Sequence, residues 1–279
     1  MTTTPPPPDA ADRTKFLVRH GAMRQLGEFL PPDRGVVARR DVVVVRTTRG
    51  TEHGEVLCPS SPQAVAHIPE PTGGVILRLA TPDDRKKVAD LAAAEARDMD
   101  AGTKLVQQHR LAMQLVAAER LFGGERLVFY FLAEHRVDFR ELVKGMAREF
   151  HTRIELRQIG VRDEAKLKAD FGDCGRPVCC NSFMMVMPPV SMRMAKLQKS
   201  TLDPTKISGR CGRLKCCLRF EQDVYEAHQE ELPPAGSRVL TRQGQGRVLA
   251  VEVLARRLLV EFEDGRRQPV TADEVLTKL

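Results

Sequence analysis

Two stretches share one cysteine frame, Cys174-Gly-Arg-Pro-Val-Cys-Cys180 and Cys211-Gly-Arg-Leu-Lys-Cys-Cys217, at an offset of 37 residues. The chain has 7 cysteines, and every one except Cys58 belongs to these two motifs. Thiolates favour zinc or iron–sulfur clusters, and four-thiolate sites are commonly assembled from two short loops. The duplication therefore predicts a metal or cluster site. Buried structural cysteines and a redox-active thiol pair are the alternatives.

The outer cysteines of each frame are the candidate metal ligands: Cys174, Cys179, Cys211 and Cys216. The remaining pair, Cys180 and Cys217, is either spare or binds a second centre shared with another chain. Glycine after the first cysteine lets the backbone turn around a metal. Neither loop has the Cys-x-x-Cys spacing of zinc ribbons, which favours an iron–sulfur cluster, with four irons expected, over zinc. The spacing leaves open which four cysteines ligate.

Basic side chains surround the two frames. Between residues 157 and 219 there are 13 Lys or Arg and 5 acidic residues, so this segment carries the surplus behind the net charge of +7. A basic surface suits RNA, DNA or an acidic protein, although an ordinary solvated face has the same composition. Aromatic residues for base stacking are scarce here. The candidate contacts to nucleic acid or a partner are Arg176, Arg213, Lys206 and Lys215.

Composition limits the class of protein. The chain has 279 residues, with 42% hydrophobic and 29% charged side chains, which is typical of globular proteins. It has no apolar run of the roughly 20 residues that cross a bilayer, and its Pro-rich start lacks the features of a secretory signal. We therefore expect a cytoplasmic protein with reduced cysteines and no membrane insertion. The sequence contains no Cys-x-x-Cys, phosphate-loop or His-x-x-x-His motif, so a catalytic role is not expected.

The pattern of elements predicts an α+β protein with several parts. The expected layout is a disordered tail (1–14), an N-terminal antiparallel β region and linker (15–74), a central α+β sandwich (75–160), a Cys-rich helical and loop segment (161–234) and a small SH3-like β-barrel (235–279).

Local signals support this layout. The β-branched run 41–48 and the return run 52–57 predict a buried hairpin. Thr81 before Pro82 predicts the start of a helix that continues to about His109. Two strands, 111–121 and 126–133, follow across a glycine pair. Asp138, three residues before Glu141, predicts a helix cap. A half-buried strand over 152–159 completes the central part.

Longer stretches resemble a known bacterial family. The segments that carry the likeness are 136–143, 152–165, Cys174-Gly-Arg-Pro, Pro204-Thr-Lys-Ile-Ser-Gly209 and Cys211-Gly-Arg-Leu with Cys216-Cys217. They are similar to the RicT (YaaT) family, which carries the C-terminal domain of the yeast polymerase-suppressor protein. The resemblance covers roughly residues 15–260. The Pro-rich start, the Met184–Met187 run and the Ala-rich helix depart from it.

The resemblance implies a function. Members of that family are cytoplasmic regulators without catalysis of their own. They join two small helical partners, RicA and RicF, in an iron–sulfur complex that assists RNase Y in mRNA processing and affects sporulation. This implies that the cysteines of both loops are the cluster candidates. The alternative is a zinc-stabilised nucleic-acid-binding protein linked to DNA replication or RNA metabolism, in which the metal only holds the fold.

Overall fold

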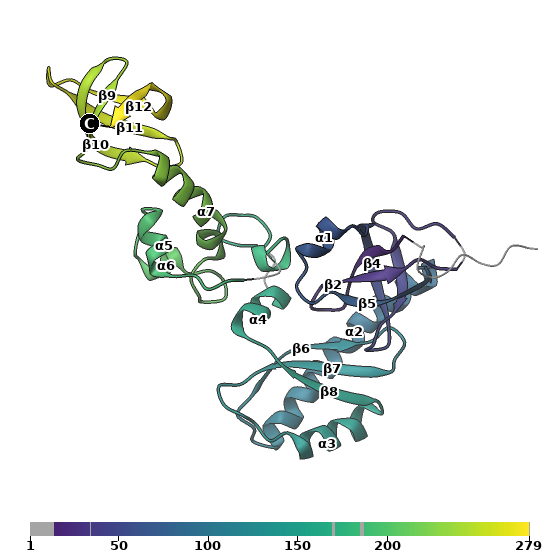
Figure 1. The fold of residues 1–279 in the computed structure, drawn as a ribbon. Helices are drawn as coiled ribbons and strands as arrows, with labels where there is room; N and C mark the ends of the chain where they lie inside the picture. The colour runs from purple at the N-terminus through teal and green to yellow at the C-terminus, as the bar shows by residue number, and fades with distance from the viewer. Residues whose placement is uncertain (1–13, 34, 169–170, 185–186, 279) are drawn as a thin grey trace, which may run out of the picture. The chain divides into compact units, whose positions relative to one another are not determined.

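The computed structural model describes residues 14–33, 35–168, 171–184 and 187–278. The chain divides into two compact units, Met1–Val186 and Met187–Leu279 (Figure 1). Helices and strands occur in both, which confirms the α+β class. Apart from Thr14, the predicted tail lies outside the described residues, as do residues 185–186 of the Met-rich run. None of the described helices is long and apolar enough to cross a membrane.

Unit 1 begins with a closed five-stranded barrel in the order β1-β2-β5-β3-β4. Its strands are β1 (Phe16–His20), β2 (Gln25–Leu30), β3 (Val42–Arg46), β4 (Thr51–Pro59) and β5 (Thr72–Leu79). The side chains of Val43 and Val45 on β3 are fully buried, with Phe29 and Ile76, at the centre of the barrel. The predicted β3–β4 hairpin is confirmed, with Val44 paired to His53.

Strand β5 closes the barrel in a way that the sequence did not predict. The stretch expected to be a linker, 59–74, instead contains a short helix α1 (Pro62–Ala66) and the first residues of β5, which pairs in parallel with β2. Two glycines make this approach possible. A Cβ on Gly27 would lie 2.2 Å from Thr72 Oγ1, and a Cβ on Gly74 would lie 2.1 Å from the Arg46 carbonyl oxygen. β5, predicted to open the central sandwich, therefore belongs to the barrel.

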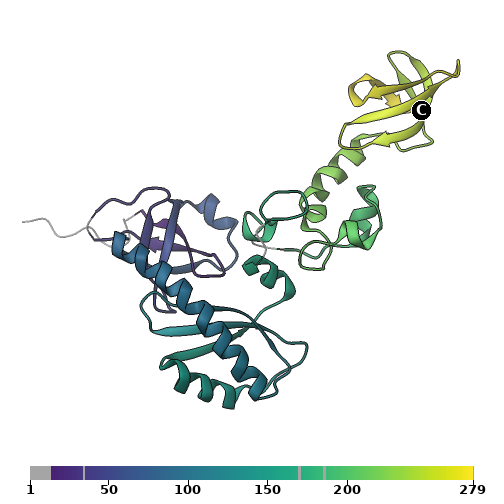
Figure 2. The same cartoon turned by 180° about the vertical axis from the view of Figure 1, so that it is seen from behind.

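The second part of unit 1 is a three-stranded sheet, β6-β7-β8, with helices α2 and α3 on one face (Figure 2). The bounds are α2 Pro82–Gln108, β6 Gln114–Arg120, β7 Arg126–Leu132, α3 Arg140–Phe150 and β8 Arg153–Gln158. β6 and β7 form the predicted antiparallel hairpin, whereas β8 returns through α3 to lie parallel to β7. Leu142 and Met146 of α3 are buried against Leu127 and Phe129 of β7.

The helix starts follow the sequence in one case and differ in the other. α2 begins after Thr81, whose hydroxyl accepts a hydrogen bond from the Asp84 amide in a reciprocal capping box. The carboxylate of Asp84 also pairs with Arg78, and this hydrogen bond holds the pKa of Asp84 well below its usual range. The cap predicted at Asp138 is wrong by one residue, because α3 starts after Phe139 and Asp138 instead accepts from the amide of Arg140, the first helical residue.

A buried polar cluster joins the barrel to the sheet. Glu119 on β6 accepts hydrogen bonds from the Ala22 amide at 2.7 Å and the Tyr130 hydroxyl at 2.6 Å, and it also pairs with Arg49 of the β3–β4 turn. The Glu119 side chain is only 9% exposed. Burial and the neighbouring charge of Glu119 raise the pKa of Tyr130 well above its usual range. Met23 packs beside this cluster with Val128 and Tyr130, so apolar and polar contacts cover the same face of the sheet.

A second buried carboxylate continues the cluster inside the barrel. Glu52 lies 3.1 Å from His20 Nδ1 and accepts from the Thr47 hydroxyl at 2.6 Å. The other ring nitrogen of His20 lies 2.8 Å from Thr72 Oγ1 on β5. Burial alone would raise the pKa of Glu52, but the hydrogen bonds from His20 and Thr47 and the charge of Arg49 lower it. The buried polar cluster therefore extends from β5 to the central sheet.

Unit 2 contains short helices followed by a five-stranded sheet. The helices are α5 (Met192–Leu197), α6 (Pro204–Ile207) and α7 (Cys216–Glu231), and the side-chain amide of Gln198, just after α5, donates to Gln222 of α7 at 3.1 Å. The sheet order is β12-β11-β10-β9-β13, with bounds Arg267–Thr271, Arg257–Phe262, Gly244–Glu252, Arg238–Thr241 and Val275–Lys278. Leu232 at the end of α7 packs into the sheet core. The strands are confirmed, and the SH3-like closure stays a prediction.

Replacing Glu119 with alanine is expected to lower the free energy of unfolding by about 3–5 kcal/mol, because Tyr130 would lose its buried acceptor and Arg49 would lose its nearest carboxylate. Urea unfolding followed by circular dichroism measures this. The matched control is Glu141→Ala, which removes an exposed ion pair with Lys144 and should cost less than about 0.5 kcal/mol. Equal effects of the two variants would contradict a structural role for the cluster.

Candidate functional site

The duplicated cysteine motif is longer than the frame first identified. Both copies read Gly-x-Cys-Gly-Arg-x-x-Cys-Cys-x-x-Phe, over residues 172–183 (the first loop) and 209–220 (the second loop). The flanking glycine and phenylalanine share the same 37-residue offset, and that offset was the signal that could have revealed them. The two phenylalanine side chains, Phe183 and Phe220, are 57% and 58% exposed.

Each loop opens with the same tight hairpin. In the first loop the Gly172 amide donates to the Arg176 carbonyl at 2.8 Å, and the Gly175 amide donates to the Gly172 carbonyl at 3.0 Å. The second loop repeats both bonds, from Gly209 to Arg213 at 2.8 Å and from Gly212 to Gly209 at 2.9 Å. Gly175 and Gly212 have φ of 73° and 71°, a left-handed conformation that favours glycine. The glycine after the first cysteine is therefore required by the turn itself.

Each loop then enters a helix at its second cysteine. The preceding residues, Val178 and Lys215, have nearly the same backbone angles, φ −56° and ψ 132° against φ −57° and ψ 130°. Cys179 begins the 3-10 turn η2 (Cys179–Asn181), and Cys216 begins α7. Neither start is capped by a side chain of the preceding residue. The vicinal cysteines therefore lie at the start of the 3-10 turn η2 in the first loop and in the first turn of α7 in the second.

The thiols differ in exposure. Cys174 is exposed, whereas the other five motif cysteines are half-buried. The Sγ of Cys174 lies over the hairpin, 3.5 Å from where a Cβ on Gly172 would be. The corresponding position at Gly209 faces the Lys215 side chain instead of a thiol, whereas both positions face the carbonyl of the motif arginine at 3.8 Å. The two loops thus share a backbone shape but not every side-chain position.

Burial and charged neighbours shift the acidity of one thiol and one lysine in and beside the loops. Burial and the neighbouring Cys216 and Glu221 raise the pKa of the Cys217 thiol. Beside the first loop, Lys166 of helix α4 (Val161–Lys168) lies near the Cys180 thiol. Burial lowers the pKa of Lys166, whereas the charges of Asp163 and Cys180 act in the opposite direction. A protonated Cys217 would have to lose its proton before it could bind a metal.

The predicted contact residues lie on the surface around the loops. Arg176, Arg213 and Lys206 are exposed, and Lys215 is half-buried. The first loop belongs to unit 1 and the second to unit 2. Within the described part of the chain, no three His, Cys, Asp or Glu side chains are gathered so that they could hold a metal ion. Each loop does offer soft thiol donors on a glycine-shaped turn, which is the kind of donor set that zinc and iron–sulfur clusters use.

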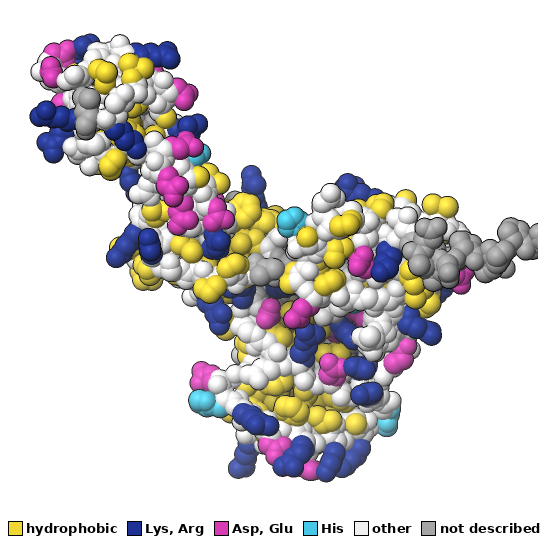
Figure 3. Space-filling view, viewed as in Figure 1, with side chains coloured by type: hydrophobic (Ala, Val, Ile, Leu, Met, Phe, Trp, Pro, Cys, Tyr) yellow, Lys and Arg dark blue, Asp and Glu magenta, His cyan; other side chains and the backbone are white. Residues whose placement is uncertain are grey.

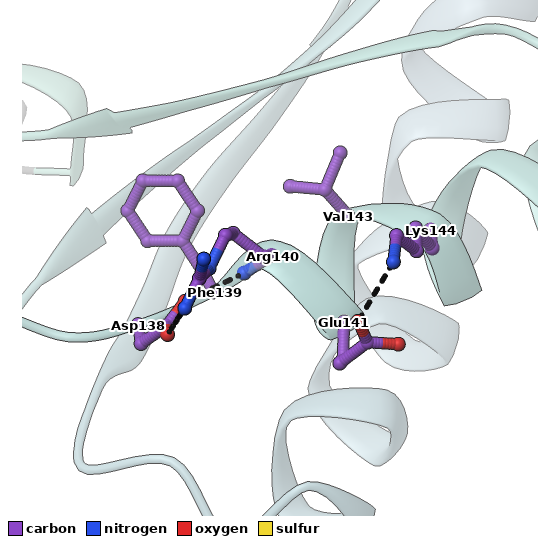
Figure 4. Close-up of a pocket in the computed structure, with 6 residues that line it drawn as sticks. All are labelled: Asp138, Phe139, Arg140, Glu141, Val143 and Lys144. Carbon is purple, nitrogen blue, oxygen red and sulfur yellow. Dashed lines mark hydrogen bonds and ion pairs between the residues drawn. The ribbon is translucent and has the colours of Figure 1, made fainter.

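Sequence reasoning missed two hollows at the start of α3. One, of 670 Å³, is lined by Asp138, Phe139, Arg140, Glu141, Val143 and Lys144 (Figure 4). The other, of 840 Å³, adds Arg136 and Gln158 near the carboxyl ends of the parallel strands β7 and β8. Ligands often bind at the carboxyl ends of parallel strands, and this rule was the signal that could have revealed the second hollow. Asp138 pairs with Arg140 at 2.7 Å and Glu141 with Lys144 at 2.8 Å, so these charges already have partners.

Comparison with known proteins relates two segments and most of the chain to known sequences. Residues 74–159 match the PSP1 C-terminal conserved region, and residues 189–232 match the third domain of PSP1-like proteins. The chain is 43% identical over 234 residues to the stage 0 sporulation protein YaaT of Bacillus subtilis, covering 84% of this chain and 85% of that one. A Schizosaccharomyces pombe protein described as uncharacterized is 33% identical over 79 residues, 28% of this chain and 10% of its own length. No solved structure matches significantly.

These matches cover both the central sheet and the helical part of unit 2 that contains the second cysteine loop. The relationship to YaaT extends over most of both chains. The chain belongs to the RicT (YaaT) family, which carries the PSP1 C-terminal region.

Proposed function

We propose that this chain is a non-enzymatic, cytoplasmic regulatory subunit that holds an iron–sulfur cluster and modulates RNA processing. The observation that carries the proposal is the repeated thiol loop, with one backbone shape in two copies, in a chain 43% identical to a protein named for sporulation. Sharing 85% of the length of that relative supports a similar role. The partners proposed by the resemblance are RicA-like and RicF-like subunits and RNase Y.

The proposed ligands are the cysteines of both loops, with Cys174, Cys179, Cys211 and Cys216 first and Cys180 and Cys217 as the alternatives. A four-iron cluster bound there would supply a redox-sensitive cross-link between the two loops. The chain's own groups would assist it: Gly175 and Gly212 shape the turns, and Arg176 and Arg213 would offset the charge of the thiolates.

The second candidate is a zinc-stabilised protein that binds nucleic acid. The observation in its favour is the exposure of Arg176, Arg213 and Lys206 around the loops, within the segment that carries the basic surplus. Cations arranged in this way attract phosphates independently of base sequence. In this case the metal would hold the loops, and the arginines would contact the backbone of RNA or DNA.

Protein purified without oxygen should contain iron and sulfide and absorb broadly in the visible range. Replacing Cys174 and Cys211 with serine should reduce the iron content to background, because serine is a poor ligand for a soft metal. Metal and sulfide analysis with an absorption spectrum measures this. The matched control is Cys58→Ser, which alters a half-buried cysteine on β4 and should keep the metal.

Zinc without iron or sulfide would contradict the cluster and favour the second candidate. In that case, Arg176→Glu with Arg213→Glu should weaken RNA binding in a filter assay and flatten its salt dependence. If neither metal is present in the chain alone or in a complex co-purified with its partners, both candidates are wrong.

The Cys217 thiol should react slowly with iodoacetamide in the metal-free protein. Its pKa is raised above the ordinary thiol value by burial, Cys216 and Glu221, so less thiolate is present at neutral pH. Mass spectrometry of labelled peptides over a pH series measures the labelling rate of Cys217, and the midpoint of that rate against pH should lie above the ordinary thiol value. Glu221→Gln removes one negative charge and should move the midpoint downward, whereas Asp223→Asn on the same helix serves as the control. An unchanged midpoint in Glu221→Gln would contradict this account.

A further inference from the structure

Strand β8 forms one edge of the central sheet. In the order β6-β7-β8 it bonds to β7 on one side, and among the described residues no strand pairs with its other side. Figure 1 shows β8 as the outer strand, with α3 alongside. Exposed strand edges present unpaired amides and carbonyls and are templates for pairing with another chain.

The backbone geometry identifies which groups face the free edge. The Ile159 amide donates to the Phe131 carbonyl of β7 at 2.9 Å. Because successive residues of a strand direct their amide and carbonyl groups to opposite sides, those of Arg153, Glu155 and Arg157 also face β7. The amides and carbonyls of Ile154, Leu156 and Gln158 therefore face the free edge.

The side chains of β8 separate into an apolar face and a charged face. Ile154 and Leu156 are half-buried against the core beneath α3, and hydrophobic side chains remain visible between β8 and α3 (Figure 3). The opposite face carries Arg153, Glu155 and Arg157, whose charges alternate in sign. Glu155 bonds Arg126 through one carboxylate oxygen, and its side chain is 37% exposed, so the other oxygen can accept a second cation.

We infer that β8 pairs with β8 of a second copy of this chain, antiparallel and centred on Leu156. A two-fold axis at Leu156 places the free-edge residues opposite one another, so that Leu156 faces Leu156 and Ile154 faces Gln158 of the other copy. Glu155 then lies opposite Arg157 of the other copy, on both sides of the axis. These are non-hydrogen-bonded positions, where opposed side chains approach closest and opposite charges stabilise the pair.

The charges select this register. Centring the pair on Glu155 would oppose two glutamates, and centring it on Arg157 would oppose two arginines, both of which destabilise a sheet. Centring it on Ile154 would oppose Arg153 and Glu155, but most of the strand would then extend past its partner, because β8 begins at Arg153. The strand is thus complementary in charge to itself. This inference is independent of the proposed metal chemistry.

Sedimentation equilibrium of the full chain in reducing buffer should show a reversible dimer. Arg157→Glu should raise the dimer dissociation constant about tenfold, because two attractive pairs become repulsive. The matched control is Arg153→Glu, an exposed arginine on the same face that has no charged residue opposite it in this register and should change the constant little. Circular dichroism should confirm that each variant folds.

A charge exchange provides the decisive test. Glu155→Arg and Arg157→Glu should each weaken self-association, because each variant opposes like charges in its own dimer. An equimolar mixture should form heterodimers. Positions 155 and 157 are both arginine in the Glu155→Arg variant and both glutamate in the Arg157→Glu variant, so every opposed pair in the heterodimer joins opposite charges. Native mass spectrometry detects these species. A monomeric wild-type chain at tens of micromolar overturns the inference. Equal effects of Arg157→Glu and Arg153→Glu, or a mixture that stays monomeric, overturn it as well.

Discussion

The carboxylate of Glu119 is the interaction on which the rest of unit 1 depends. It accepts hydrogen bonds from Ala22 and Tyr130 and pairs with Arg49, so three elements of the fold meet at one buried side chain. Such a group is costly to bury unless every donor is in place. The barrel and the sheet are therefore fixed relative to each other by chemistry as well as by apolar packing.

Local signals in the sequence predicted most elements but not how the distant ones meet. The helix start at Thr81 and the β6–β7 hairpin were visible because their partners lie within a few residues. The parallel pairing of β2 with β5 was not visible, since Gly27 and Thr72 are far apart in the chain and leave no periodic pattern. The partners of Glu119 were hidden for the same reason. The cysteines were predicted as a group, whereas the exposure of Phe183 and Phe220 and the hairpin shape of each loop were visible only in the structure.

The two cysteine loops show how one backbone shape can be built from different side chains. Pro177 and Val178 in the first loop correspond to Leu214 and Lys215 in the second, yet the angles before the helix agree closely. The shared parts are the two glycines, the arginine and the cysteines, so these residues determine the turn. What differs is the surrounding charge: Lys166 lies near Cys180, whereas Glu221 lies near Cys217. The loops are alike in geometry and unlike in electrostatics.

The close approach of strands at Gly27 and Gly74 has a consequence for how this chain can vary. No side chain fits at either position, because a Cβ would overlap Thr72 or the Arg46 carbonyl. A screen for loss-of-function alleles would therefore return these glycines, and under the proposed function it would also return the motif cysteines. The two classes would separate by protein abundance in the cell: glycine alleles would be degraded as misfolded chains, whereas under the proposed cluster function cysteine alleles would accumulate as intact but inactive protein.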